Sequence, residues 1–162
     1  MSTAHDLQPP QWLVSTLQCT KCRHSLEVAA DRLRCAACGA AFAVDRGVVN
    51  VLDEAHPAVE SERKAVAALD AGEVTLPVPP GDADAEAAFH RHVTQSRRQL
   101  EDVLDQFPIP RGALVVELGA DSCWASPLFL DRGCRVLAVD ITDHLHLAEA
   151  ADHLGLGRVQ CD

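Results

Sequence analysis

The sequence predicts an α/β protein in which a small, mostly β zinc-binding unit precedes the first half of a doubly wound parallel sheet. Two observations lead to this fold class. Four cysteines occur as two Cys-x2-Cys pairs near the N-terminus, and the last third of the chain alternates short apolar runs with segments of helical character. These patterns divide the chain into a tail (1–16), the zinc-binding unit (17–53), a linker (54–84) and an incomplete α/β unit (85–162).

The composition is that of a folded protein without a membrane span. The 162 residues are 48% hydrophobic, but no run approaches the roughly 20 apolar residues that a transmembrane helix needs. The N-terminus lacks a basic segment followed by an apolar one, so we expect no secretory signal and a cytoplasmic protein. The formal net charge is −10 and no segment is strongly basic, which gives nucleic-acid binding no support.

The cysteine pairs have the spacing of a zinc site. Their members are Cys19, Cys22, Cys35 and Cys38. Each Cys-x2-Cys turn aims two sulfur atoms at one ion, and two such turns complete a tetrahedron around Zn2+. Because thiolates would fill all four positions, no position remains for water, and we expect the zinc to be structural. Gly39 follows the second pair, where a chain reversal favours a residue that tolerates positive φ.

Short strands flank the cysteines. Residues 26–28 and 32–35 predict two strands joined by a turn at Ala30-Asp31, and residues 41–44 predict a third strand with an extended exit over 48–52. A core of this size gains too little from burial to fold alone. We therefore expect the metal to supply much of the folding free energy of this unit.

A resemblance supports this interpretation. The run LQCTKCRHSLEV…LRCAACGAAFAVDRGVVNVL, within 17–53, resembles the zinc-ribbon family that includes the small activator protein of tRNA and translation-factor methyltransferases. The resemblance implies a zinc ribbon and a protein partner bound through it. Thr20 departs from the family, which often has proline after the first cysteine.

Helices separate the ribbon from the α/β unit. Residues 60–71 predict a short helix, and the proline cluster at 76–81 marks a linker. A longer helix is predicted from about residue 85 to residue 107, where Pro108 ends it.

The α/β unit begins with two runs typical of buried parallel strands. Residues 113–118 and 135–141 are short, apolar and rich in β-branched side chains. Helices are predicted over 124–131 and from residue 142 to about 154, and a third strand over 158–162. This β-α-β-α-β order is one half of a doubly wound sheet.

Acidic residues lie at the ends of these strands. Glu117 lies near the end of the first strand, and Asp140 follows Gly119 by 21 residues. At that distance an acidic side chain can meet the ribose hydroxyls of a nucleoside cofactor. A dinucleotide fingerprint would need glycine at 119, 121 and 124. The chain has Asp121 and Trp124 at the last two positions, which disfavours pyrophosphate binding.

A second resemblance concerns the cofactor. The segment VVELGADSCWAS (115–126) resembles the first motif of the class I S-adenosylmethionine-dependent methyltransferases, a family with a Rossmann-like fold, and the likeness extends over 112–162. It implies S-adenosylmethionine as the cofactor. In the implied site Glu117 and Gly119 lie beside the methionine end, Asp140 binds the ribose hydroxyls, Ile141 packs near adenine and Asp162 contacts the adenine amine. Asp121 departs from the family, which usually has glycine there.

Two functions from different classes remain open at this point. One is an S-adenosylmethionine-dependent methyltransferase with a structural zinc ribbon and a methyl-acceptor substrate. The other is a non-catalytic zinc-ribbon adaptor that binds a separate methyltransferase.

The first strand of the α/β unit should be exposed. Doubly wound sheets add strands beyond their first one, so we expect Val115 and Val116 at an open apolar edge. The chain would then be part of a longer enzyme, or a partner would cover the edge. Residues 1–162 alone would supply one wall of the cofactor site, bind S-adenosylmethionine weakly or not at all, and not catalyse transfer.

Overall fold

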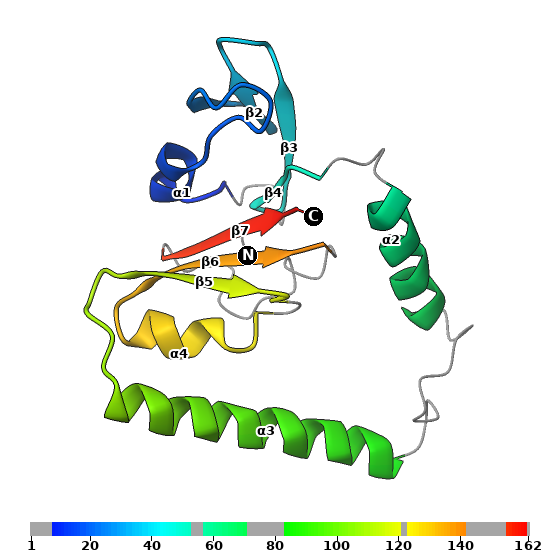
Figure 1. Cartoon of the computed structure of the whole chain (residues 1–162), viewed down its shortest axis with the longest axis vertical. Helices are drawn as coiled ribbons and strands as arrows, with labels where there is room; N and C mark the ends of the chain where they lie inside the picture. The colour runs from blue at the N-terminus through cyan, green and yellow to red at the C-terminus, as the bar shows by residue number, and fades with distance from the viewer. Residues whose placement is uncertain (1–7, 53–56, 71–82, 121–122, 142–154, 162) are drawn as a thin grey trace, which may run out of the picture.

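The computed structural model of the chain describes residues 8–52, 57–70, 83–120, 123–141 and 155–161 (Figure 1). The described residues form an α/β structure around one mixed sheet, and the cysteine pairs lie before β1 and after the start of β2 in the N-terminal part of the chain. Asp121, Asp162 and the helix predicted from residue 142 to about 154 lie outside the described residues.

Seven strands make up this sheet, in the order β1-β2-β3-β4-β7-β6-β5. The first three junctions, from β1 to β4, are antiparallel, and the last three, from β4 to β5, are parallel. The strands are β1 (Leu26–Ala29), β2 (Arg32–Cys35), β3 (Ala41–Asp45), β4 (Val48–Asn50), β5 (Leu114–Leu118), β6 (Arg135–Asp140) and β7 (Leu156–Gln160).

The helices within the described residues are α1 (Gln11–Thr16), α2 (Pro57–Asp70), α3 (Ala83–Gln106) and α4 (Ser126–Asp131). Helix α1 lies in the stretch predicted as a tail; it begins directly after Pro10 and buries Leu13 completely. The long helix α3 contacts the end of α4 through an ion pair of 2.8 Å between Asp105 and Arg132. None of the described helices combines the length and the apolar character that a membrane crossing requires.

Each predicted element among the described residues forms within three residues of its expected ends, and two of the differences have clear reasons. Strand β7 begins at Leu156 rather than at residue 158, because Gly157 is a strand residue and not part of a turn. Its missing side chain leaves room for Trp12, whose ring would lie 2.9 Å from an added Cβ. Helix α4 begins at Ser126 rather than at residue 124, because the preceding turn still continues at Cys123, which has a φ of 60°.

Strand β4 joins the ribbon to the parallel strands. Residues 48–52 were expected only as an extended exit, but Val48–Asn50 pairs with β3 on one side and with β7 on the other. In the parallel pair Val49 lies opposite Val159. The hydrogen bonding continues past the strand, where the N–H of Val51 donates to the carbonyl of Gln160 at 2.9 Å. The ribbon and the α/β unit are therefore parts of one sheet.

The two faces of the parallel strands are covered by different helices. Because side chains alternate along a strand, Val136 of β6 faces one side and Leu137 the other. Helix α4 packs on the first side, in a core that we call the α4 core: Val48, Ala120, Cys123, Leu130, Val136, Ala138 and Leu156. Helix α1 packs on the other, in the ribbon core: Leu13, Cys19, Leu26, Leu33, Cys35, Phe42, Val49 and Val159, with Leu137 against it.

Strand β5 is the edge of the sheet, as predicted. Among the described strands only β6 pairs with it. Val115 is half-buried on the side of α4, whereas Val116 is 51% and Leu118 76% exposed on the opposite side. Exposed apolar side chains on an unpaired edge mark a surface that another strand can cover.

Candidate functional site

The four predicted zinc ligands converge between the loop that follows α1 and the turn that follows β2. Cys19 and Cys22 come from the loop, Cys35 ends β2, and Cys38 lies in the turn before β3. All four sulfur atoms lie within 4.8 Å of one another. The Cys22–Cys35 sulfur atoms are 3.4 Å apart and the Cys19–Cys38 sulfur atoms 3.6 Å apart. A tetrahedron with Zn–S bonds of about 2.3 Å places its sulfur atoms about 3.8 Å apart, so the cluster fits a zinc ion.

The two cysteine turns have the same backbone hydrogen bonds. In the first, the N–H of Arg23 donates to the carbonyl of Cys19 and the N–H of Cys19 donates to the carbonyl of His24, both at 2.8 Å. In the second, Gly39 and Ala40 make the equivalent bonds with Cys35 at 2.9 and 2.8 Å. The fourth residue after each leading cysteine has positive φ, 62° at Arg23 and 76° at Gly39. The prediction for Gly39 is confirmed, and each turn is a preformed knuckle.

Hydrogen bonding sets the acidity of the thiols. Burial raises the pKa of Cys19, but backbone hydrogen bonds with Lys21 and Cys22 and thiol hydrogen bonds outweigh it and lower the pKa to about 7. The pKa of Cys35 is also lowered, mainly by a backbone hydrogen bond with Cys38. A backbone hydrogen bond with His24 lowers the pKa of Cys22, but thiol hydrogen bonds to Cys35 and Cys38 outweigh it and raise the pKa to about 12. A cation held between the sulfur atoms would favour the thiolate at every position.

A second candidate site lies where the parallel strands end. Glu117 is half-buried near the end of β5, and its Oε2 accepts a hydrogen bond of 2.6 Å from the hydroxyl of Ser126. Burial raises the pKa of Glu117 above the ordinary carboxyl value, and hydrogen bonds with Ser126 and the backbone of Ala125 offset part of that rise. The carboxylate is therefore held in one orientation near the sheet edge.

The described part of the turn after β5 begins with a glycine of positive φ. Gly119 has a φ of 64°, and an added Cβ would meet nothing within 4 Å. The need for glycine is therefore conformational rather than steric. The next residue, Ala120, is completely buried, and its N–H donates to the carbonyl of Val139 at 3.2 Å. This bond ties the turn after β5 to the end of β6.

Asp140 and Ile141 lie at the end of β6, and both are half-buried. Two bonds from the end of β7 hold their backbone. The N–H of Cys161 donates to the carbonyl of Asp140, and Nε2 of Gln160 donates to the carbonyl of Ile141, both at 2.9 Å. The structure thus brings Glu117, Asp140 and Ile141 to one end of the parallel strands, whereas Asp162 lies outside the described residues.

Sequence reasoning missed two residues of this second site. Ser126 is completely buried against Glu117, and a serine directly before Pro127 at a predicted helix start is a signal that could have found it. Gln160 is buried and bonds a backbone carbonyl. No sequence pattern identifies such a partner, because every residue carries a carbonyl.

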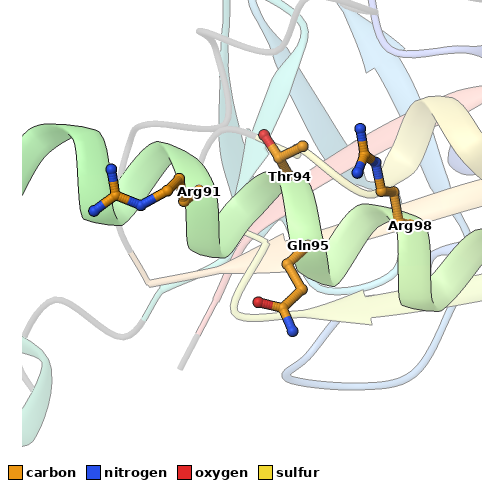
Figure 2. Close-up of a pocket in the computed structure, with 4 residues that line it drawn as sticks. All are labelled: Arg91, Thr94, Gln95 and Arg98. Atoms are coloured by element: carbon orange, nitrogen blue, oxygen red, sulfur yellow. The ribbon is translucent and has the colours of Figure 1, made fainter.

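One hollow on the surface lies apart from both sites. Figure 2 shows its lining residues Arg91, Thr94, Gln95 and Arg98, whose side chains all extend from α3. All four residues are exposed, and the described lining comes from this one helix. We assign no ligand to it.

Comparisons of the sequence with protein families and curated proteins identify no relative. No protein-family model matches the chain, and no curated protein is detectably similar to it in sequence. A functional assignment therefore depends on the chemistry of the two sites.

Proposed function

We propose that the chain is an S-adenosylmethionine-dependent methyltransferase that carries a structural zinc ribbon. One observation carries this proposal. Two half-buried acidic residues, Glu117 and Asp140, lie at the same end of the adjacent parallel strands β5 and β6, with a positive-φ glycine after the first. In open α/β sheets, ligands bind outside the carboxyl ends of the strands.

The chemistry of these residues selects among cofactors. S-adenosylmethionine has a sulfonium and an ammonium group but no phosphate, so a carboxylate at its methionine end attracts it. The lack of glycine at positions 121 and 124 disfavours the pyrophosphate of a dinucleotide. Glu117 would face the methionine end, Asp140 would bind the ribose hydroxyls, and Ile141 would pack on adenine. The cofactor supplies an activated methyl group when it is bound. The residues at the ends of β5 and β6 would hold and orient the cofactor.

The zinc ribbon has a structural role in this proposal. Its four thiolates complete the coordination of the ion and leave no position for a substrate or water. Zinc therefore contributes folding free energy rather than Lewis-acid chemistry.

A non-catalytic adaptor is the second candidate, and the exposed edge of the sheet favours it. Val116 and Leu118 would suit a surface that docks on a separate methyltransferase. In that case Glu117 and Asp140 would bind no cofactor.

A titration of the 15N-labelled chain with S-adenosylmethionine, followed by NMR, separates the two candidates. Such spectra detect the weak, millimolar binding expected of a one-walled site. We expect chemical shift changes at the amides of Gly119, Asp140 and Ile141, and no comparable changes with NAD+. If millimolar S-adenosylmethionine moves none of these amides, residues 1–162 do not form a cofactor site by themselves and the adaptor is favoured.

A further inference from the structure

The metal centre and the ends of the parallel strands are joined by one core. Two of the four cysteines, Cys19 and Cys35, are buried in the ribbon core, which also contains Val49 of β4 and Val159 of β7. Val49 is completely buried and lies opposite Val159 in the parallel pair. The sulfur ligands and strand β7 therefore share one set of packed side chains.

Backbone and side-chain hydrogen bonds run along the same route. Strand β3, which follows the second cysteine turn, pairs with β4, and β4 pairs with β7. A guanidinium N–H of Arg158 in β7 donates to the carbonyl of Arg46, between β3 and β4, at 2.9 Å. The N–H of Val51 donates to the carbonyl of Gln160 at 2.9 Å. Strand β7 is thus attached to the ribbon from Arg158 to Gln160.

The C-terminal end of β7 is bonded to Asp140 and Ile141, two of the candidate cofactor-binding residues. The side-chain Nε2 of Gln160 donates to the carbonyl of Ile141, and the backbone N–H of Cys161 donates to the carbonyl of Asp140. A shift of β7 would therefore move the backbone of both residues. The ribbon contacts continue to this end of the strand, because Gln160 pairs with Asn50 of β4 and Cys161 packs against the ribbon core.

The ribbon cannot hold β7 in place without its own folding, and its strands have only three to five residues. Strands this short, around so small a core, depend on the metal for stability. We infer that metal binding by the four cysteines and ligand binding at the ends of β5 and β6 are thermodynamically coupled through the β4–β7 pair. The coupling itself follows from the contacts above, and only the identity of the ligand rests on the proposed function.

Amide hydrogen exchange of the full chain, measured with bound zinc and after removal of zinc by a chelator, tests the coupling without any cofactor. We expect the amides of Val51 and of residues 156–160 to exchange at least roughly tenfold faster without zinc. The amide of Gly133, which bonds the carbonyl of Leu130 at 2.8 Å at the end of α4, should change less and serves as the internal reference. Equal exchange of β7 in the two forms would overturn the inference.

A titration of both forms with S-adenosylmethionine gives the second readout. Zinc should raise the apparent affinity by roughly tenfold, and by linkage the cofactor should raise zinc affinity by the same factor. Equal affinities in the two forms would also overturn the coupling. Binding to neither form would contradict the proposed function instead, and the exchange measurement would still decide whether zinc controls β7.

Two matched variants keep the test valid if the zinc-free chain unfolds. Val49 and Val136 are both completely buried strand valines, one in the ribbon core and one in the α4 core. With zinc bound, Val49→Ala should raise the rate of amide hydrogen exchange in β7. It should also lower the affinity for zinc, measured in competition with a chelator. Val136→Ala should leave the zinc competition unchanged. Equal effects of the two variants on zinc affinity would show general destabilisation and would count against a route through β4.

Discussion

The hydroxyl of Ser126 donates a hydrogen bond of 2.6 Å to Oε2 of Glu117, from a position with no exposure to solvent. The bond joins the start of α4 to the end of β5 across the turn that contains Gly119. It fixes the direction of a carboxylate that is itself half-buried. The pair therefore has two effects. It stabilises the fold, which unfolding experiments measure, and it orients the carboxylate, which ligand affinity reports.

Replacement of Ser126 by alanine should lower the free energy of unfolding at neutral pH by about 1–2 kcal/mol. A hydrogen bond to a charged group contributes about 1.5–3 kcal/mol, and the partial exposure of Glu117 reduces this. Urea denaturation of the zinc-bound chain measures the change. A double-mutant cycle with Glu117→Ala, which removes the acceptor, is the control, and strict additivity of the two single changes would contradict a direct interaction.

The raised pKa of Glu117 predicts a pH dependence with a defined sign. Burial makes the folded state hold this proton more tightly than the unfolded chain does. The stability that the protonated carboxyl contributes is thus present at low pH, and it is lost as pH rises from about 4.3 through the raised pKa. The advantage of Glu117→Gln over the wild type in free energy of unfolding should grow across this range and then level off. A difference that is constant with pH would refute the shift.

Substitution of both cysteines of the second knuckle should abolish metal binding. Cys35→Ser with Cys38→Ser leaves two thiolates, which cannot complete a tetrahedral site. We expect one zinc per chain in the wild type, none in the variant, and unfolding of residues 17–53. Metal analysis and NMR spectra measure both effects. Cys134→Ser is the matched control, because this buried cysteine lies outside the cluster, and it should keep its zinc.

Asp140→Ala should weaken the binding of S-adenosylmethionine by about 1–3 kcal/mol if the carboxylate binds the ribose hydroxyls. Calorimetry or the NMR titration measures the change in dissociation constant. Asp131→Ala serves as the control, because Asp131 is an exposed acid at the end of α4 and should leave the affinity unaltered. An equal loss in both variants would indicate a general effect of charge rather than a contact with ribose.

Gly157→Ala should destabilise the fold by about 1–3 kcal/mol through overpacking. The new Cβ would lie 2.9 Å from the ring of Trp12 and 3.1 Å from the side chain of Leu13. Thermal or urea unfolding measures the loss. Combination with Trp12→Phe, which shortens the ring, should cost less than the sum of the two single changes. A fully additive double variant would place the strain elsewhere.

The sequence predicted those parts of the fold that depend on local patterns. The cysteine spacing predicted the cluster, because ligands three residues apart need only one tight turn. The apolar runs at 113–118 and 135–141 predicted β5 (Leu114–Leu118) and β6 (Arg135–Asp140) to within one residue at each end. Glu117 and Asp140 could be placed at or near strand ends because their positions follow from the strands themselves.

The missed features are long-range or lack a pattern. The β4–β7 pair was not predicted, because nothing local distinguishes an extended exit such as 48–50 from a strand whose partner is far along the chain. Helix α1 has six residues, too few for a helical period to be visible, and its burial depends on contacts with β7 and the ribbon. Contact between distant segments decides all of these.

The parallel pairing of β4 with β7 also determines the order in which the molecule can be built. Val48 and Arg158 are partners, and ribosomes add about 5–20 residues per second, so β4 emerges about 5–20 s before its partner. During that interval the metal-bound ribbon would present β4 as an open edge, to which strands of other chains can add. Closure of the sheet is therefore a late, non-local step in folding, and we expect it to limit the folding rate.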